Sequence, residues 1–367
     1  MPATPRNTIT VDARMIDASG IGTCIAEWLP RLIAARPEVD FVLIGPGPTL
    51  AALPWTRAPN ARVIEFDAPI YSIWEQVALP GRVPRRTDVL WSPHFNIPVA
   101  WRGRLVVTIH DLAHLALPEF AGGLHRRAYA RFMFDRVSRS ADAIMTDSEF
   151  TRAEFARLVG VRRAEPQVVH LGVDRRWFEI PPSPSPHPRP YLLYVGNVKP
   201  HKNLSRLLQA FEQLAPRISC DLLIIGKNEG FLSGDAGARA AAERLAPRVQ
   251  LLGTVPQELL QRYVSHAEAA VQPSLYEGFG LPPLEAMAAG CPAIVSRAAS
   301  LPEVCGDAAL YFDPLDSGSI AEAILRLLHQ PELRATMRCR GLERARHFSW
   351  DRSAAAVLTV LERLLAA

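Results

Sequence analysis

Short apolar runs alternate with longer amphipathic stretches along most of this chain. The runs are TITVDAR, FVLIGP, LVVTIHD and AIMTDS in the first half, and YLLYVGN, CDLLIIGK, VQLLG, AAVQPS and CPAIVS in the second. Runs of this kind, separated by helical patterns, are typical of parallel strands that are buried on both faces. We therefore predict an α/β protein with two Rossmann-like, doubly wound domains that face each other across a cleft.

Proline marks the predicted division between the domains. The stretch PPSPSPHPRP, from Pro181 to Pro190, has six prolines and no apolar periodicity, which favours a semi-extended linker. The prediction is an N-terminal domain over 1–180, a linker over 181–190 and a C-terminal domain over 191–348. A last helical segment covers 349–367, and the sequence leaves open whether it packs back onto the N-terminal domain.

Composition narrows the class of protein. A chain of 367 residues is longer than one hydrophobic core usually supports. The N-terminus lacks the pattern of a signal peptide, and no apolar run approaches the roughly 20 residues that span a bilayer. The five cysteines are scattered, without the paired spacing of a zinc or redox site. These features predict a cytoplasmic protein with reduced thiols.

The small positive charge is confined to the first half. Residues 1–190 hold 23 Arg and 19 acidic residues, a net charge of +4, whereas the remainder has 18 of each sign. An Arg-rich helix carrying Arg126, Arg127 and Arg131 could contact an anionic membrane or substrate. An ordinary solvated surface explains the same pattern equally well. Nucleic acid is a poor fit because no aromatic-basic stacking pattern occurs.

The stretch SLYEGFGLPPLEAMAAGCP places two glutamates, Glu277 and Glu285, on either side of a glycine loop. The loop follows a strand that ends near Pro273, and a short helix begins at Leu281. The N–H groups of Phe279, Gly280 and Leu281 then form a helix N-terminus that suits a phosphate group. Glu285 alone could simply complement the helix dipole. As a pair, the two carboxylates can accept hydrogen bonds from sugar hydroxyls.

A second candidate lies in YVGNVKPHKNLSRLLQAF, where a strand ends at Gly196 and a helix begins near Asn203. Lys202 stands at this strand-to-helix turn, and its charge suits a phosphate. Lys199 is better explained as a solvated loop residue.

Two further candidates lie in the first half. In VDARMIDASGIGTC, the glycines of SGIG, including Gly22, open a helix and would let an anion approach the backbone. In LVVTIHDLAHL, His110 ends an apolar strand beside Asp111, at the edge of the sheet where ligands bind. His110 has either a structural or a functional role, and His94 is a weaker candidate. We expect His114 to lie on a helix surface, with contact to an acceptor or a membrane as the alternative.

Taken together, these segments resemble the retaining, nucleotide-sugar-dependent glycosyltransferases of family 4, which have two Rossmann-like domains of the GT-B type. The motif variants are most similar to those of bacterial GDP-mannose-dependent mannosyltransferases. The resemblance covers nearly the whole chain and rests on VDARMIDASGIG, TIHDL, ADAIMTDSEFTR, HLGVDRRWF, YVGNVKPHKNL, the paired-glutamate motif, SLPEVCGDAALYFDP and FSWDRSA.

The resemblance implies a role for each matching residue. Glu285 would hold the ribose hydroxyls, Glu277 would bind the donor sugar, and Lys202 would neutralise the diphosphate. His110 would lie beside the transferred sugar near the bond that breaks. The complete set of implied donor-binding residues is Gly22, Gly196, Asn197, Lys202, Phe279, Gly280, Leu281 and Glu285, with His110, Glu277 and Lys202 as catalytic residues and Gly226, Lys227, Val255 and Pro256 as base contacts.

Two positions depart from the family pattern, namely Asn197 and, in HLGVD, Leu171, where many relatives have asparagine. Many relatives have an arginine shortly after the glycine that corresponds to Gly196, and this chain has Asn197 there. The charge of the leaving diphosphate then depends more on Lys202 and the helix N-termini, with Lys199 as a partial substitute.

The resulting hypothesis is retaining transfer of a hexose, with mannose from GDP-mannose as the preferred donor, to a hydroxyl of a glycan or a polyprenyl-diphosphate-linked glycan. The acceptor would belong to surface polysaccharide assembly, such as O-antigen, capsule or exopolysaccharide. No metal and no cofactor are expected, and peripheral contact with the anionic inner membrane is one prediction. UDP-glucose, UDP-GlcNAc and dTDP-rhamnose remain alternative donors. The alternative functions are a nucleotide-sugar epimerase or hydrolase and a non-catalytic two-domain sugar-binding protein.

Overall fold

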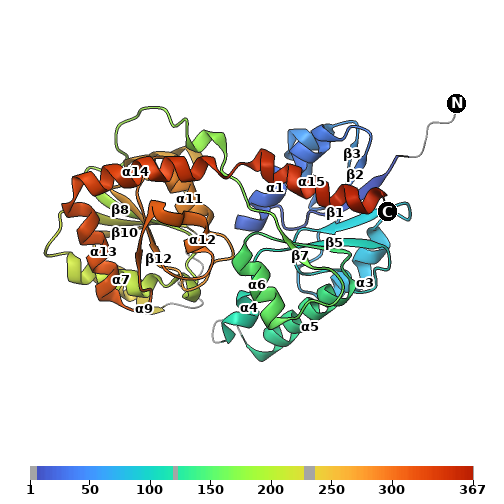
Figure 1. The fold of residues 1–367 in the computed structure, drawn as a ribbon, viewed down its shortest axis with the longest axis horizontal. Coiled ribbons are helices and arrows are strands. Elements are labelled where there is room, and N and C mark those ends of the chain that lie inside the picture. Colours follow the sequence, from blue (N-terminus) through green and yellow to red (C-terminus); the bar gives the residue numbers. More distant parts are fainter. Residues whose placement is uncertain (1–5, 119–122, 227–235, 367) are drawn as a thin grey trace. The chain divides into compact units, whose positions relative to one another are not determined.

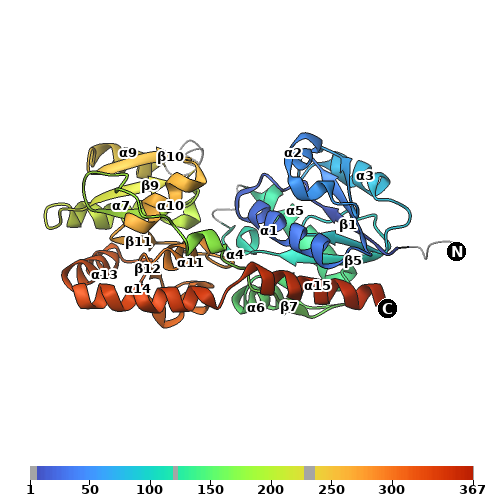
Figure 2. The same cartoon turned by 90° about the horizontal axis from the view of Figure 1, so that it is seen from above.

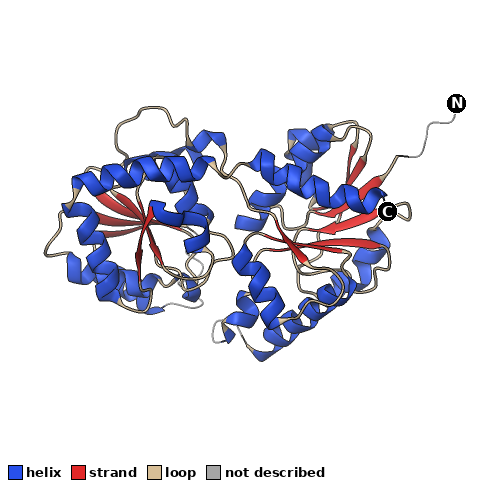
Figure 3. Ribbon diagram, viewed as in Figure 1, coloured by secondary structure: helices blue, strands red, loops and turns tan. Residues whose placement is uncertain are grey.

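The chain forms two α/β units in the computed structural model, which describes residues 6–118, 123–226 and 236–366. One unit comprises residues 1–172 and 350–367, and the other comprises residues 173–349. Within each unit, helices cover both faces of a twisted central sheet, as Figures 1 and 3 show. This layering is the doubly wound arrangement that the buried apolar strands predict.

The first sheet is parallel throughout, with the strand order β3-β2-β1-β4-β5-β6-β7. Its strands are β1 (Thr8–Asp12), β2 (Asp40–Gly45), β3 (Ala61–Glu65), β4 (Val89–Ser92), β5 (Arg104–Ile109), β6 (Ala143–Thr146) and β7 (Pro166–Val168). The helices of this unit are α1 (Ser19–Ala35), α2 (Gly47–Ala52), α3 (Ile73–Arg82), α4 (Ala113–Ala116), α5 (Leu124–Ser140), α6 (Glu149–Leu158) and α15 (Trp350–Ala366), with the 3₁₀ turn η1 (Pro54–Arg57).

The second sheet is also parallel, with the order β10-β9-β8-β11-β12-β13. Its strands are β8 (Tyr191–Val195), β9 (Asp221–Ile225), β10 (Val249–Gly253), β11 (Ala269–Gln272), β12 (Ala293–Ser296) and β13 (Ala309–Phe312). The helices are α7 (Leu204–Leu214), α9 (Ala236–Arg244), α10 (Gln257–His266), α11 (Leu281–Ala288), α12 (Leu301–Cys305), α13 (Ser317–His329) and α14 (Pro331–Arg346), with the 3₁₀ turns η3 (Arg175–Trp177), η4 (Pro200–Lys202) and η5 (Gly306–Ala308).

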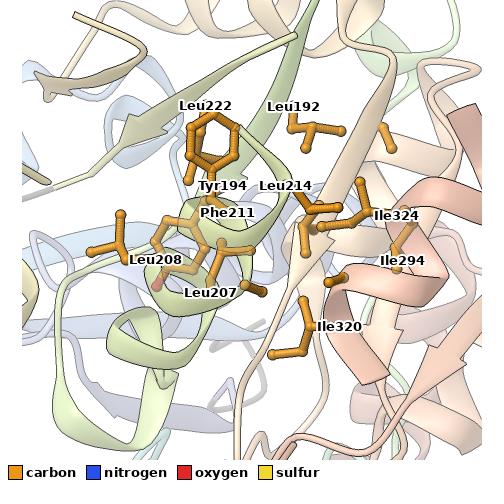
Figure 4. Packing of buried hydrophobic residues seen from close by; sticks show 14 of the residues in the cluster. Leu192, Tyr194, Leu207, Leu208, Phe211, Leu214, Leu222, Ile294, Ile320 and Ile324 are labelled. Atoms are coloured by element: carbon orange, nitrogen blue, oxygen red, sulfur yellow. The ribbon is translucent and has the colours of Figure 1, made fainter. Parts of the chain in front are cut away.

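Helix α7 shows how the apolar pattern builds the second core. Its residues Leu207, Phe211 and Leu214 recur at helical spacing and are fully buried. They pack with β-strand residues such as Leu192 and Leu222 in one cluster (Figure 4). Burying each large apolar side chain contributes about 1.5–3 kcal/mol. This packing fixes the start of α7, and therefore the turn that carries Lys202, against the sheet.

The closing helix α15 belongs to the first unit, where it lies beside α1 (Figures 1 and 2). The indole nitrogen of Trp28, on α1, donates a hydrogen bond to the Ser353 hydroxyl on α15 at 2.8 Å. Both side chains are buried. The sequence does not determine whether this last helix packs onto the N-terminal domain. The structure shows that it does, because α15 contacts α1.

The division between the units falls earlier than the sequence indicates. The first unit ends at residue 172 and not at 180, and the proline-rich segment 181–190, predicted to be the linker, lies within the second unit. Proline removes an amide donor but leaves the backbone carbonyls as acceptors. The carbonyl of Ser183 accepts from His266 at 2.8 Å, and that of Pro184 accepts from Arg262 at 3.2 Å. These bonds to α10 hold the segment on the second unit.

Across the described ranges, none of the helices has both the length and the hydropathy that a membrane span requires.

Candidate active site

The strand order of the second sheet predicts where a ligand would bind. The chain order reverses between β8 and β11, which are neighbours in the sheet. In open parallel sheets, ligands bind outside the carboxyl ends of the strands at such a reversal, because the loops leave in opposite directions. The loop after β8 leads to η4 and α7, and the loop after β11 leads to α11. The two strongest candidates, Lys202 and Glu277, lie in these two loops.

Lys202 and Glu277 form an ion pair across this point of the sheet. The Nζ atom of Lys202 lies 2.6 Å from Oε2 of Glu277. The Glu277 side chain is 9% exposed and that of Lys202 is 20% exposed. The pair is therefore shielded from most solvent, while the ammonium group keeps some access to it. The two residues are 75 positions apart in the sequence, so local motifs do not predict that they pair.

The other oxygen of Glu277 is held by neutral donors. Its Oε1 accepts from Ser274 Oγ at 2.7 Å and from Gln272 Nε2 at 3.0 Å. Burial alone would raise the pKa of Glu277, but the nearby charge of Lys202 and the hydrogen bonds from Lys202 and Ser274 lower it on balance. Glu277 is therefore a fixed carboxylate at neutral pH, oriented by its neighbours.

Asn203 fixes the turn that presents Lys202. Its backbone is left-handed, with a φ of 61°, and it is the N-cap residue of α7. Asparagine tolerates this conformation better than most residues. Its side-chain nitrogen donates to the carbonyls of Pro273, at 2.9 Å, and Pro314, at 2.8 Å. The Lys202 turn is thereby tied directly to the loop that carries Glu277.

The predicted phosphate site lies at the start of α11. Gly280 caps the helix with a φ of 110°, and a Cβ atom there would lie 2.7 Å from Leu301. Gly280 and Leu281 have no hydrogen-bond acceptor for their N–H groups among the described residues, as expected for a helix N-terminus. Phe279 is buried against Phe348, with ring centroids 5.6 Å apart. Glu285 lies on α11 and is partly buried.

Gly196 and Gly226 end neighbouring strands, β8 and β9, in close contact. A Cβ atom on Gly226 would lie 2.0 Å from the carbonyl oxygen of Gly196, which no rearrangement of a side chain could relieve. Asn197 follows in the same turn, and its carbonyl accepts from the Tyr194 hydroxyl at 3.2 Å.

Among the predicted base contacts, Gly226 donates its N–H to the Gly253 carbonyl at 2.9 Å, so the ends of β9 and β10 are joined. Val255 and Pro256 follow β10 at the same edge, and Pro256 is the N-cap residue of α10. Lys227 lies outside the described residues. Gly226, Val255 and Pro256 therefore lie at the carboxyl edge of neighbouring strands β9 and β10, and their role as base contacts stays a prediction.

In the first unit, His110 follows β5 and is engaged at both ring nitrogens. Nδ1 lies 2.7 Å from Asp147 Oδ2, and Nε2 lies 3.0 Å from the carbonyl oxygen of Pro93. Trp28 stacks on the ring at 6.2 Å. Burial would lower the pKa of His110, but the Asp147 carboxylate and these hydrogen bonds raise it. Because both partners are acceptors, the geometry suits the doubly protonated ring.

Gly22 lies within the first turn of α1 and is buried. A Cβ atom there would lie 2.2 Å from the carbonyl oxygen of Ile16. This gives Gly22 a packing role against the preceding turn, and its contact with a donor stays a prediction.

A buried ionic cluster that no local motif predicts lies at the chain reversal of the first sheet, between β1 and β4. Arg14 donates to Asp12 at 2.6 and 2.8 Å and to Glu75 at 2.7 Å. His94 Nε2 lies 3.2 Å from Asp12. Burial would raise the pKa of Asp12, but His94 and Arg14 hold it well below its usual range. The local signal was the charged pair in VDAR at the end of a strand, since buried charges normally require partners.

No group of three or more His, Cys, Asp or Glu side chains that could hold a metal ion occurs within residues 6–118, 123–226 and 236–366.

Two family models match this chain, one on each half. Residues 18–177 match the model described as Glycosyltransferase Family 4, and residues 175–344 match that of Glycosyl transferases group 1.

Among curated proteins, the chain is similar to the O-antigen chain mannosyltransferase B of Escherichia coli, with 34% identity over 278 residues, covering 71% of this chain and 70% of that protein. It is 29% identical over 284 residues to the GDP-mannose-dependent α-(1-6)-phosphatidylinositol dimannoside mannosyltransferase of Mycobacterium tuberculosis, covering 71% of this chain and 69% of that protein.

Solved structures share the fold over the full length. Sucrose-phosphate synthase from Thermosynechococcus elongatus superposes with a TM-score of 0.82 at 22% identity, covering 98% of this chain and 100% of that one. Anabaena HepE in complex with UDP and glucose superposes with a TM-score of 0.79 at 17% identity, with the same coverage of both chains. At these identities the likeness concerns the fold alone.

Proposed function

The chain belongs to the family 4 glycosyltransferases, which have the GT-B fold, and we propose that it transfers mannose from GDP-mannose to a glycan hydroxyl with retention of anomeric configuration. The donor is proposed from the relatives, since two of the similar proteins are named O-antigen chain mannosyltransferases and another is named GDP-mannose-dependent. The acceptor would be a growing surface polysaccharide.

The observation that carries the proposal is the Lys202–Glu277 ion pair at the chain reversal of the second sheet. Breaking the bond from the sugar to the diphosphate places negative charge on the leaving oxygen. A preset cation and free helix N–H groups stabilise that charge most strongly in the transition state. In the proposed complex, the Lys202 ammonium group donates hydrogen bonds to the diphosphate, and the Glu277 carboxylate accepts a hydrogen bond from a sugar hydroxyl.

The proposed chemistry uses no carboxylate nucleophile. The acceptor hydroxyl attacks from the face that the diphosphate leaves, and a diphosphate oxygen takes the hydroxyl proton. The new glycosidic bond forms as the bond to the diphosphate breaks, so mannose is transferred and GDP is released. Glu277 orients the sugar, Glu285 holds the ribose, and Lys202 with the N–H groups of α11 receives the charge. We assign no step to a metal ion or a cofactor.

We further propose that the acceptor is linked to polyprenyl diphosphate and is reached at the cytoplasmic face of the inner membrane. Helix α5 supports this idea because Arg126, Arg127 and Arg131 are exposed on it. Binding to vesicles with and without anionic lipid, at low and high salt, tests the contact. Binding that ignored both lipid charge and salt would refute it.

A donor panel tests the main proposal. The protein is incubated with GDP-mannose, UDP-glucose, UDP-GlcNAc or dTDP-rhamnose and a mannose-containing acceptor, and the products are identified by mass spectrometry and NMR. We expect transfer from GDP-mannose and an α-linked product. Transfer from another donor alone would refute the mannose assignment, and a β-linked product would refute retention.

A further inference from the structure

An aromatic cluster lies in the first unit beside His110, and the proposed mechanism gives it no role. The ring of Tyr71 lies near-parallel to that of Phe95, with centroids 5.7 Å apart and an angle of 25°. Phe95 in turn stacks on Phe134 of α5 at 4.5 Å. Tyr129, also on α5, meets the Tyr71 ring edge-on at 6.0 Å. Phe134 is fully buried, whereas Tyr71 remains 47% exposed, so the stack ends in an accessible ring.

The backbone holds Tyr71 in an unusual conformation. Its φ is 66°, in the left-handed region that a bulky residue rarely adopts. The Tyr71 N–H donates to Oε1 of Glu75 at 2.9 Å. Residues keep such conformations only where the surroundings impose them, and these positions cluster at ligand sites.

Glu75 is a fully buried anchor for this conformation. Its Oε1 also accepts from Asn96 Nδ2 at 2.5 Å, and its Oε2 accepts from Arg14 at 2.7 Å. The buried charge of Glu75 is thus satisfied from several elements, which makes its position hard to change. The Tyr71 ring is therefore presented by a rigid support.

The cluster is continuous with the His110 site. Phe95 belongs to the segment after β4 whose Pro93 carbonyl contacts Nε2 of His110 at 3.0 Å. His114, four residues after His110, meets the Phe95 ring at 6.0 Å. The exposed ring of Tyr71 follows β3 and His110 follows β5, so both lie at the carboxyl edge of the first sheet, joined through Phe95 and the segment that carries Pro93.

We propose that Tyr71 is a platform on which a sugar ring of the acceptor glycan stacks. The inference rests on the proposed function and specifies how its acceptor is bound. A sugar ring has an apolar face of C–H groups and a polar rim of hydroxyls. A tyrosine offers the matching combination, a flat apolar body with a polar tip, and loses little side-chain freedom because the ring is already stacked.

The test compares three substitutions at Tyr71. Tyr71→Gly removes the ring while adopting a positive φ without strain, so the loop keeps its conformation. Tyr71→Ala removes the ring under strain, and Tyr71→Phe keeps the ring. Leu315→Ala, at a residue of the second unit that is 64% exposed, is the control for loss of an exposed apolar side chain.

Steady-state kinetics are measured with GDP-mannose and with methyl α-D-mannopyranoside and its α-linked disaccharide as acceptors. We expect Tyr71→Gly and Tyr71→Ala to raise the acceptor KM about tenfold, the size of one ring-stacking interaction. The donor KM, and the rate of any donor hydrolysis without acceptor, should not change. Tyr71→Phe and Leu315→Ala should stay within about twofold of wild type.

An unchanged acceptor KM in Tyr71→Gly, with normal donor kinetics, would overturn the proposal, as would a defect in Tyr71→Phe as large as that in Tyr71→Gly. Loss of vesicle binding in Tyr71→Gly without any change in acceptor KM would also overturn it, since the ring would then contact lipid. If no donor is used at all, the proposed function fails first. Saturation-transfer NMR with the same mannosides then still decides whether Tyr71→Gly loses sugar binding.

Discussion

The Lys202–Glu277 pair allows a structural role to be separated from a role in transfer. Lys202→Met removes the ammonium group and keeps an apolar side chain. The buried Glu277 then keeps only the neutral donors Ser274 and Gln272 for its charge. Breaking a fully buried pair costs about 3–5 kcal/mol. Because Lys202 is 20% exposed and solvent weakens the pair, we expect a smaller cost, about 2–3 kcal/mol.

Glu277→Gln keeps Oε1 as an acceptor but removes the charge, and it leaves a partly solvated lysine. We expect a loss of about 1 kcal/mol. The double variant Lys202→Met/Glu277→Gln contains no unpaired buried charge, so it should recover about 2 kcal/mol relative to the sum of the single variants. Urea denaturation of all four proteins measures this coupling.

Activity should behave differently from stability. If Lys202 stabilises the leaving diphosphate, its removal lowers kcat by roughly 10²–10³. Neutralising Glu277 cannot restore that charge, so the double variant should regain stability but not transfer. A double variant with wild-type kcat would refute the reasoning, because Lys202 would then serve only to neutralise Glu277.

The pKa of His110, the packing of Gly22 and the absence of a metal step in the proposed mechanism each lead to a prediction. Because the pKa of His110 is raised above its ordinary value of 6.5, its contribution to stability is present below about pH 6.5 and is lost as pH rises through the folded pKa. The difference in unfolding free energy between wild type and His110→Gln should therefore shrink from pH 6 to pH 9, and a difference that stays constant would contradict the assignment. Burial also raises the pKa of its partner Asp147, which lowers stability above that carboxyl's ordinary pKa of 3.8. Gly22→Ala should destabilise the protein by about 1–3 kcal/mol or more, because its Cβ would lie 2.2 Å from the Ile16 carbonyl oxygen. The control Gly20→Ala has open space at Cβ and should be neutral or stabilising by up to about 1 kcal/mol. Thermal denaturation compares the two variants, and equal effects would refute the steric explanation. Transfer should continue in excess EDTA, and a loss of rate that Mg²⁺ or Mn²⁺ reverses would contradict a mechanism without metal.

Much of the fold follows from local pattern. The apolar runs at β1, β2, β5, β8 and β9 are long and rich in branched residues, so their strands could be predicted from the sequence. Strand β3, with the sequence ARVIE, lies at the sheet edge and has no fully buried residue. Strand β7 is only three residues long. Neither has the continuous apolar signal of a central strand, and both were missed.

In the candidate site, too, the locally marked residues could be predicted and the contacts between distant segments could not. The turn carrying Lys202 and the loop between Glu277 and Glu285 were predictable because strand ends, glycines and prolines mark them locally. The ion pair itself depends on which strands are neighbours, and 75 residues separate its two members. The Arg14–Glu75 contact, over 61 residues, was missed for the same reason. The prediction of a proline-rich linker was wrong because the carbonyl groups of Ser183 and Pro184 accept hydrogen bonds from α10, which composition does not reveal.

The measurement that tests the central claim most directly is a crystal structure of the protein with GDP-mannose. We predict that the diphosphate lies between the loops after β8 and β11, within hydrogen-bond distance of Lys202 Nζ and the N–H groups of Gly280 and Leu281. The ribose hydroxyls should bond to Glu285, and a mannose hydroxyl should bond to Glu277. A nucleotide bound away from this chain reversal, with Lys202 still paired only to Glu277, would contradict the account.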